Sequence, residues 1–460
     1  MTVKGNVTVA ATEDRTGTST AITTRHNLRT TSKRMDTKRF NKLCGDEEDY
    51  NFRRRSRTAS ASGQCSQFPE AGSGMIVLSG HFRWWRGQEI LGFFNGVLHQ
   101  IQQELLFCEH ASGISVLEMS HRSADFAAIL KSTEQLFREQ MKISDDYCVL
   151  FMHGGGSGQF AAVPLNLQYL WKGDGAPSAD YLITGSWSDK AAKEAQKYVK
   201  VHKPLPVTKT YTSIPDPVTW DLSSNPAYLY YCANETIHGI EFHEAPAVPS
   251  HVALVADISS NILSRPFDVS KHTVVVAGTQ KNLGAAGLTL AIVAKDVLGH
   301  AHPMTPSIFD YDEVHKTNSI YNTPPVFNVY VTKLILEWIR DQGGADVIFE
   351  RNRVKAQMLY DVIDGSDGFY TSAVAPHCRS QMNIPFRIGA DGGDEKLEAE
   401  FMKLAKHNDM ISLKGHRSVG GIRVSLYNSV TLEETEKLVN LLKHFQETHS
   451  TPKAIRNGAH

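Results

Sequence analysis

The sequence lacks an excess of charge of either sign. Its 460 residues include 48 basic and 49 acidic side chains, which gives a formal net charge of −1. This balance does not favour a nucleic acid or an anionic membrane as a partner. No apolar run is long and pure enough to cross a bilayer. We therefore expect the ligand to be a small molecule.

Closely spaced cysteines are also absent. The six cysteines are scattered, with no pair at metal-ligand spacing, which favours reduced thiols in an intracellular compartment. The stretch that holds His238, Glu241, His243 and Glu244 has no recognised metal-ligand spacing either. We predict no metal site and a cytoplasmic protein.

The length of the chain exceeds the size at which one hydrophobic core usually stops growing, so two domains with extensions are expected. Residues 1–74 have almost no periodic apolar pattern and are predicted to be a disordered extension. Their basic, hydroxyl-rich start also resembles an organellar transit peptide, but it has no clear amphipathic stripe. Beyond them we expect a large α/β domain over 75–350, a smaller α+β domain over 351–450 and a tail over 451–460.

Strand patterns alternate with helical patterns along the middle of the chain. This alternation predicts a mainly parallel sheet with helices on both faces. Strands are expected at 148–152, 180–184, 227–232, 251–256, 272–277 and 288–294, and helices at 98–106, 126–137 and 189–199. In the C-terminal part, strands are expected at 382–388 and 422–427, and helices beyond 352, at 396–408 and at 432–445.

Lys281 follows the apolar strand 272–277 in a turn rich in small residues. Desolvation at a strand end would lower the pKa of its amine and expose the neutral nucleophile that forms a Schiff base with a carbonyl cofactor. A lysine stem packed on the sheet edge with its head in water is the other interpretation. Asp257 ends a second apolar strand, and a carboxylate is the usual partner of a protonated pyridine nitrogen. Both strand ends therefore suit one cofactor.

A glycine-rich loop, residues 153–159 (HGGGSGQ), follows the first strand and opens a helix near Phe160. Backbone N–H groups and a helix N-terminus suit a phosphate, although many such loops are plain turns. The loop is neither an ATP-binding P-loop nor the spaced dinucleotide fingerprint. Trp187 follows the next strand and could stack on a flat ring or simply belong to the core.

Seven segments together closely resemble the phosphoserine aminotransferase family. They are residues 153–166 (HGGGSGQFAAVPLN), 233–239 (ANETIHG), 257–261 (DISSN), 278–282 (GTQKN), 321–325 (YNTPP) and 413–423 (LKGHRSVGGIR), with 114–122 (ISVLEMSHR) in a eukaryotic form. The resemblance runs in order from about residue 97 to residue 445.

The resemblance implies a homodimeric, fold-type I enzyme with pyridoxal 5′-phosphate as its cofactor, built on a mainly parallel seven-stranded sheet. Such a phosphoserine transaminase moves the amino group of L-glutamate to 3-phosphohydroxypyruvate and gives O-phospho-L-serine and 2-oxoglutarate, a step of L-serine biosynthesis. A class-V aminotransferase acting on another amino acid is the alternative function.

The resemblance also assigns the cofactor contacts. Lys281 would bind the cofactor covalently and transfer the proton at Cα, and Asp257 would hold the pyridine nitrogen protonated. Trp187 would stack on the ring. The remaining contacts would come from Thr236 on the phenolic oxygen, from Gly156, Ser157 and Gln280 on the phosphate, and from Asn322 and Thr323 of the partner subunit.

Both substrates carry an α-carboxylate and a second anion, which suits the planar fork of arginine. By resemblance Arg423 would bind the α-carboxylate. His121, Arg122, His416 and Arg417 would receive the phosphate or the γ-carboxylate. From the sequence alone, exposed arginines are usually solvated surface residues.

The N-terminal part departs from the family. Members have a Gly-Pro-Ala turn near the active site, whereas residues 75–96 carry Leu78, Ser79 and Gly80 followed by Trp84 and Trp85. A divergent segment, a wrongly joined exon or start, and a catalytically impaired variant all fit this departure. We favour the second, which would leave residues 1–93 foreign to the folded enzyme.

Overall fold

The computed structural model describes residues 94–108, 113–389 and 392–450, so the expectations for 1–93 and for the tail lie outside the described residues. The helices are α1 (Phe94–Glu104), α2 (Ala124–Met141), α3 (Gly155–Leu167), α4 (Ser186–Ala195), α5 (Tyr311–Lys316), α6 (Val326–Asp341), α7 (Ala345–Asp364), α8 (Glu395–His407) and α9 (Leu432–His449). The strands are β1 (Tyr147–Met152), β2 (Ser178–Leu182), β3 (Lys200–His202), β4 (Tyr228–Cys232), β5 (Asn234–Glu235), β6 (Ile240–Glu241), β7 (Ala253–Asp257), β8 (Val274–Gly278), β9 (Thr289–Ala294), β10 (Tyr370–Thr371), β11 (Asn383–Ile388) and β12 (Ile422–Ser425).

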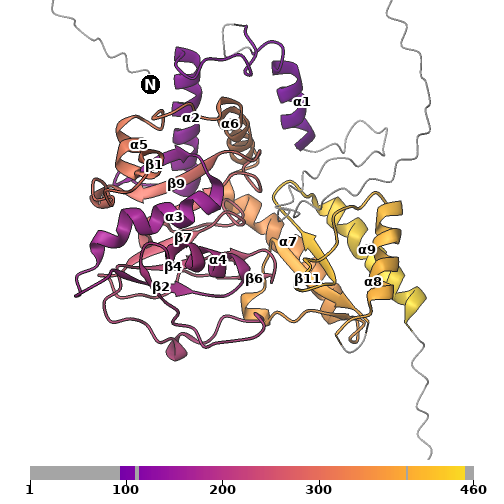
Figure 1. Cartoon of the computed structure of the whole chain (residues 1–460). Coiled ribbons are helices and arrows are strands. Elements are labelled where there is room, and N and C mark those ends of the chain that lie inside the picture. The colour runs from indigo at the N-terminus through magenta and orange to yellow at the C-terminus, as the bar shows by residue number, and fades with distance from the viewer. Residues whose placement is uncertain (1–93, 109–112, 390–391, 451–460) are drawn as a thin grey trace, which may run out of the picture. The chain divides into compact units, whose positions relative to one another are not determined.

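A seven-stranded sheet in the order β1-β9-β8-β7-β4-β2-β3 forms the centre of the larger part of the fold (Figure 1). The pairs from β8 through β3 are parallel, and only β9 runs antiparallel to both of its neighbours. The prediction of a mainly parallel seven-stranded sheet is confirmed.

Strand β8 shows why the centre of this sheet is apolar throughout. Val275 and Ala277 belong to the core on one face, with residues of α2 and α6, whereas Val274 and Val276 belong to the core on the other face, with residues of α3 and α4. A strand covered on both faces has no solvated side, so its sequence is a continuous apolar run.

The ends of four strands meet at one edge of the sheet. Cys232 pairs with Asp257 at the ends of β4 and β7, while Gly278 and Met152 both pair with Thr289 at the start of β9. Because carboxyl ends of parallel strands share an edge, the loops that follow β1, β7 and β8 converge there.

A second, antiparallel sheet, β10-β11-β12, has its own core with α7, α8 and α9. Asn428, just beyond β12, joins it to the larger sheet: its N–H donates to Asn282 Oδ1 at 3.0 Å and its side chain donates to the Leu263 carbonyl at 2.9 Å. The division into domains at 350/351 remains a prediction.

The expected strands of the larger sheet lie within about two residues of the observed ones, but β3 and the helix α6 were not expected. The helix expected at 189–199 begins earlier, at Ser186, and ends at Ala195. A buried carboxylate from another segment caps its first turn, and sequence periodicity cannot indicate such a partner.

No helix in the described ranges is both long enough and apolar enough to span a membrane.

Candidate active site

Lys281 lies three residues beyond β8, at the edge where the strand ends meet, and is half-buried. Its ammonium nitrogen is 5.8 Å from the centroid of the Trp187 ring. Within the described part of the chain no carboxylate pairs with it. The neighbouring Gln280 is also half-buried and turns back over Gly278. The structure therefore places an uncommitted amine beside an aromatic ring.

Asp257 ends β7 and is 5% exposed. Ser259 donates to its Oδ1 twice, from the backbone N–H at 2.9 Å and from the hydroxyl at 2.6 Å. The same hydroxyl accepts the N–H of Gly278 at 3.0 Å, which ties the end of β7 to the end of β8. The hydroxyl of Tyr230 is 3.4 Å from the other oxygen, Oδ2. That contact is long, so Oδ2 can accept a further donor.

The glycine-rich loop after β1 reaches the same edge. Gly154 has φ of 89° and begins the turn, and the Gly155 N–H donates to Thr289 Oγ1 at 2.7 Å. A Cβ added to Gly156 would lie 3.8 Å from Asp257 Oδ2, so the loop faces the carboxylate. The first N–H groups of α3 have no partner within the helix, which suits an anion. Ser157 lies in this first turn and is exposed.

Trp187 is fixed by two residues of the β5 segment. Its indole N–H donates to Thr236 Oγ1 at 2.9 Å. Glu235, which is fully buried, accepts the backbone N–H of Trp187 at 3.0 Å and that of Ser188 at 2.7 Å. This carboxylate occupies the space that a side chain at Gly185 would need. The first turn of α4, and with it the indole ring, is thereby anchored to the sheet edge.

Burial raises the pKa of Glu235, and the hydrogen bonds from Ser188 and Trp187 oppose that rise. All of these contacts donate to the carboxylate, so they favour its ionised form.

Arg423 on β12 extends from the smaller sheet to the same β5 segment. Its guanidinium donates to the carbonyl of Thr236 at 3.3 Å, and burial lowers its pKa. The preceding loop closes on itself, because the Gly415 N–H donates to the Gly421 carbonyl at 2.8 Å. Any side chain at position 415 would overlap the backbone of Gly420. This closed loop presents His416 and Arg417.

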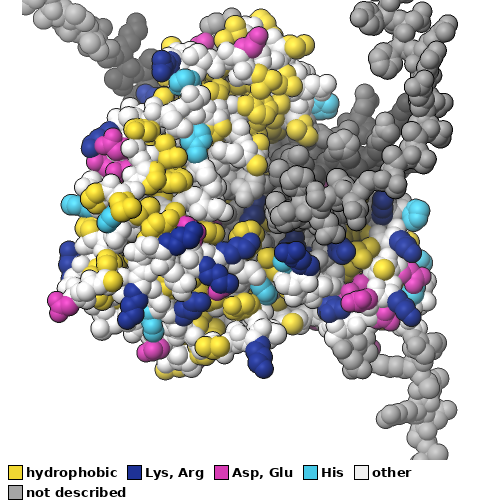
Figure 2. Space-filling view, in the orientation of Figure 1, with side chains coloured by type: hydrophobic (Ala, Val, Ile, Leu, Met, Phe, Trp, Pro, Cys, Tyr) yellow, Lys and Arg dark blue, Asp and Glu magenta, His cyan; other side chains and the backbone are white. Residues whose placement is uncertain are grey.

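His416 lies among positive charges. Burial lowers its pKa, and the charges of Arg423, Arg417 and Lys190 lower it further. Burial lowers the pKa of His238 to about 4, with His416 adding to the effect. Figure 2 shows Lys and Arg side chains gathered over α4 and β6 on this face, with few acidic side chains between them. An anion bound here would relieve this repulsion.

The structure does not unite all of the predicted residues. His121 and Arg122 lie just before α2, and no hydrogen bond or ion pair between described residues joins them to His416 or Arg417. Asn322 and Thr323 lie just before α6 and are exposed. Their roles remain predictions that depend on a second subunit.

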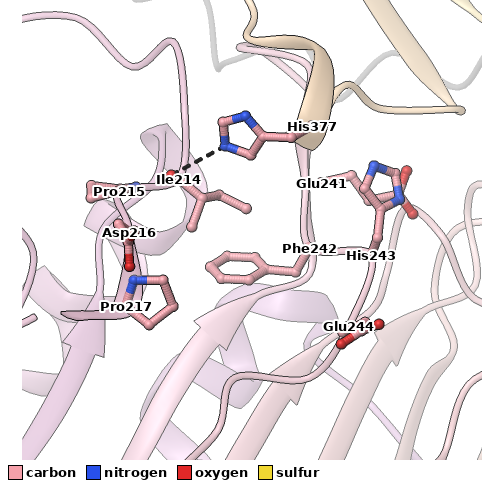
Figure 3. A pocket seen from close by; sticks show the side chains of 9 residues that line it. All are labelled: Ile214, Pro215, Asp216, Pro217, Glu241, Phe242, His243, Glu244 and His377. Carbon is pink, nitrogen blue, oxygen red and sulfur yellow. Dashed lines mark hydrogen bonds between the residues drawn. The ribbon is translucent and has the colours of Figure 1, made fainter. Parts of the chain in front are cut away.

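The pocket drawn in Figure 3 lies away from the predicted residues. Its cavity is about 580 Å³, and its lining includes His243, Glu244 and His377 but none of the cofactor or substrate residues predicted above. Glu241 at its margin is already engaged by Arg265 at 3.1 Å. No cluster of metal-ligating side chains occurs among the described residues.

Sequence reasoning missed three residues of the candidate site: Glu235, Ser259 and Lys190. Glu235 lies next to Thr236, and Ser259 lies two residues beyond Asp257. Their hydrogen bonds to distant segments, to α4 for Glu235 and to Gly278 for Ser259, cannot be read from the sequence. Lys190 follows Trp187 by three residues, which is the spacing of neighbours on one helix face. This three-residue spacing from Trp187 is the sequence signal that could have identified Lys190.

Comparison with known proteins gives consistent matches. Residues 94–438 match the family model described as aminotransferase class-V. A Caenorhabditis elegans protein named "Probable phosphoserine aminotransferase" is 52% identical over 77% of this chain and 94% of its own length. The phosphoserine aminotransferase of Drosophila melanogaster is 50% identical over 77% and 95%. The solved PLP-bound phosphoserine aminotransferase of Trichomonas vaginalis is 36% identical, with a TM-score of 0.71 over 76% of this chain and 96% of that one.

We expect Glu235→Gln to lower the free energy of unfolding by about 1–3 kcal/mol. Trp187 and Ser188 donate to different oxygens of the carboxylate, whereas the amide has only one acceptor oxygen, so its NH2 would face one of these two N–H groups and leave it without an acceptor. Urea denaturation measures the change. Glu194→Gln, on the same helix, is the control and should cost less than about 1 kcal/mol because its pair with Lys197 is at the surface. Equal losses in the two variants would contradict the anchoring role.

Proposed function

The chain belongs to the class-V aminotransferases and, within them, to the phosphoserine aminotransferases, and we propose that it transfers the amino group of L-glutamate to 3-phosphohydroxypyruvate. The products are 2-oxoglutarate and O-phospho-L-serine, so the reaction serves L-serine biosynthesis. The observation that carries the proposal is a lysine and a nearly buried aspartate at one sheet edge, beside a helix N-terminus and a group of cations. Neither the lysine nor Arg423 nor Lys190 has a carboxylate partner among the described residues.

The residues present fit pyridoxal 5′-phosphate. Among the described residues, Asp257 Oδ2 has only the long contact to Tyr230, so it can accept a pyridinium N–H. Thr236 accepts from Trp187, and its own hydroxyl hydrogen has no acceptor among the described residues, so it can donate to the phenolic oxygen. The first turn of α3, with Gly156 and Ser157, offers N–H groups to the phosphate.

When bound, this cofactor supplies an electron sink for the substrate's Cα. Lys281 would hold the cofactor and then, once released, move the proton at the substrate's Cα. Asp257 would hold a proton at the ring nitrogen, and Trp187 would cover one face and exclude water. Gln280 would contribute to the phosphate site, with Asn322 and Thr323 of a second subunit.

Substrate binding would divide between two anion sites. Arg423 lies within hydrogen-bond distance of the Thr236 carbonyl and would take the α-carboxylate close to the cofactor. His416 and Arg417 would receive the phosphate or the γ-carboxylate, joined by His121 and Arg122 of the partner subunit. The clustered cations favour a doubly anionic substrate over alanine or serine, which is the argument against another class-V substrate.

We propose a cytoplasmic enzyme. The described cysteines Cys148, Cys232 and Cys378 are free thiols, which suits a reducing compartment.

We also propose a homodimer. Apolar side chains are exposed at the end of α1 and in the segment that follows, with Leu106 87%, Phe107 59% and Leu117 64% exposed. Large exposed apolar side chains that gather in one short stretch of sequence suit a subunit interface. Sedimentation equilibrium should give the mass of two chains, and Leu117→Glu should shift the equilibrium towards one chain. A wild-type mass of one chain would contradict the shared active site.

Lys281→Ala should lower the transamination rate by about a thousandfold or more, because it removes both the covalent anchor and the proton-transfer group. The rate is measured as 2-oxoglutarate-dependent consumption of O-phosphoserine. Lys295→Ala, which changes an exposed lysine beyond β9, is the control and should keep the wild-type rate. An active Lys281→Ala enzyme would overturn the assignment.

Arg423→Ala should raise KM for O-phosphoserine and for glutamate alike, by about tenfold to a hundredfold, because both substrates have an α-carboxylate. Arg417→Ala should raise KM for O-phosphoserine more than for glutamate, since it would lose a partner of the phosphate. Steady-state kinetics with each substrate separates the two roles. Identical profiles for the two variants would refute the division into two anion sites.

A further inference from the structure

Lys190, on the second turn of α4, lies at the candidate site but is not among the predicted cofactor or substrate residues. Its side chain is exposed, and its ammonium nitrogen lies 4.2 Å from the centroid of the Trp187 ring, closer than that of Lys281 at 5.8 Å. A cation over an indole face is held there by the ring's quadrupole. The same ring thus fixes the position of Lys190 and borders the amine of Lys281.

The other lysines of this helix and its end are paired. Lys193 forms an ion pair with Asp189 at 2.6 Å, and Lys197 pairs with Glu194 at 2.7 Å. Lys190 has no carboxylate partner in the described ranges, although Asp189 is its neighbour in sequence. Its charge is therefore left for a ligand or for solvent.

The surroundings of Lys190 favour a ligand. Its charge, with those of Arg423 and Arg417, lies close enough to His416 to lower the pKa of that imidazole, after the effect of burial. Three segments far apart in sequence (α4, the loop before β12, and β12 itself) thus bring cations together. Like charges at one place are unfavourable in the free protein, and a multiply charged anion offsets that cost.

We propose that Lys190 is a further substrate-recognition residue, which attracts the phosphate of the phosphorylated substrate to the site on its own chain. This inference rests on the proposed function. A lysine ammonium is a compact point charge and a common phosphate ligand, whereas the planar fork of Arg423 suits a carboxylate. A phosphate carries close to two negative charges at neutral pH and a γ-carboxylate carries one. Lys190 therefore discriminates by charge between the two amino donors.

Lys190→Gln tests this inference, with Lys193→Gln as the matched control one turn along the same helix. In Lys190→Gln we expect KM for O-phosphoserine to rise about threefold to tenfold, KM for glutamate to rise less than about twofold, and kcat to stay near wild type. Raising the ionic strength from about 20 to about 200 mM should weaken O-phosphoserine binding to the wild type more than to Lys190→Gln. Lys193→Gln should match the wild type in both KM values and in kcat.

Lys190→Arg should restore most of the affinity for O-phosphoserine, because it restores the charge. Equal KM values for wild type and Lys190→Gln, or the same rise for both substrates, would overturn the inference. So would an unchanged salt dependence. If the wild type itself fails to react with O-phosphoserine, the proposed function fails first, so the two failures are distinguishable. The visible absorbance of bound cofactor should be the same in all of these variants, which excludes an effect through cofactor loss.

Discussion

The nearly buried carboxylate of Asp257 is the constraint on which the rest of the site depends. A charge that is 5% exposed is costly unless donors and a cation compensate it. Ser259 supplies two hydrogen bonds to one oxygen and, by accepting the N–H of Gly278, fixes β8 and the turn that carries Lys281. The second oxygen has no comparable donor among the residues that the structure describes. Asp257 thus orders two strand ends and leaves one acceptor for a protonated ring nitrogen.

The positively charged side chains of the candidate site form no ion pair with Asp257 among the described residues. Lys281, Lys190 and Arg423 have no carboxylate partners in the described part of the chain, and His416 is held towards its neutral form by burial and by its cationic neighbours. Glu235 does not pair with any of these cations among the described residues. Its carboxylate accepts two backbone N–H groups at the N-terminus of α4 and thereby fixes the position of Trp187. Cations without a carboxylate partner among the described residues suit substrates that carry two anionic groups.

Much of this was visible in the sequence. The apolar runs that end at Asp257 and before Lys281 predicted two neighbouring strands of a parallel sheet, and the shared edge follows from that topology. The anchoring of α4 was not predictable, since Glu235 and Trp187 are far apart along the chain and only the fold joins them. The short edge strand β3 has three residues, too few for a periodic pattern. His121 and Arg122 were predicted to share a site with His416. No hydrogen bond or ion pair between described residues joins them, so this prediction depends on the proposed dimer.

The most direct measurement is the visible absorbance spectrum of the purified chain with pyridoxal 5′-phosphate, followed through one addition of O-phosphoserine and one of 2-oxoglutarate. The account predicts a band of protein-bound cofactor that O-phosphoserine bleaches and 2-oxoglutarate restores, because the cofactor held by Lys281 and Asp257 would supply the carrier of the amino group. A band that O-phosphoserine leaves unchanged would contradict the assigned substrate. The absence of any bound-cofactor band would contradict the site built on Asp257 and Lys281.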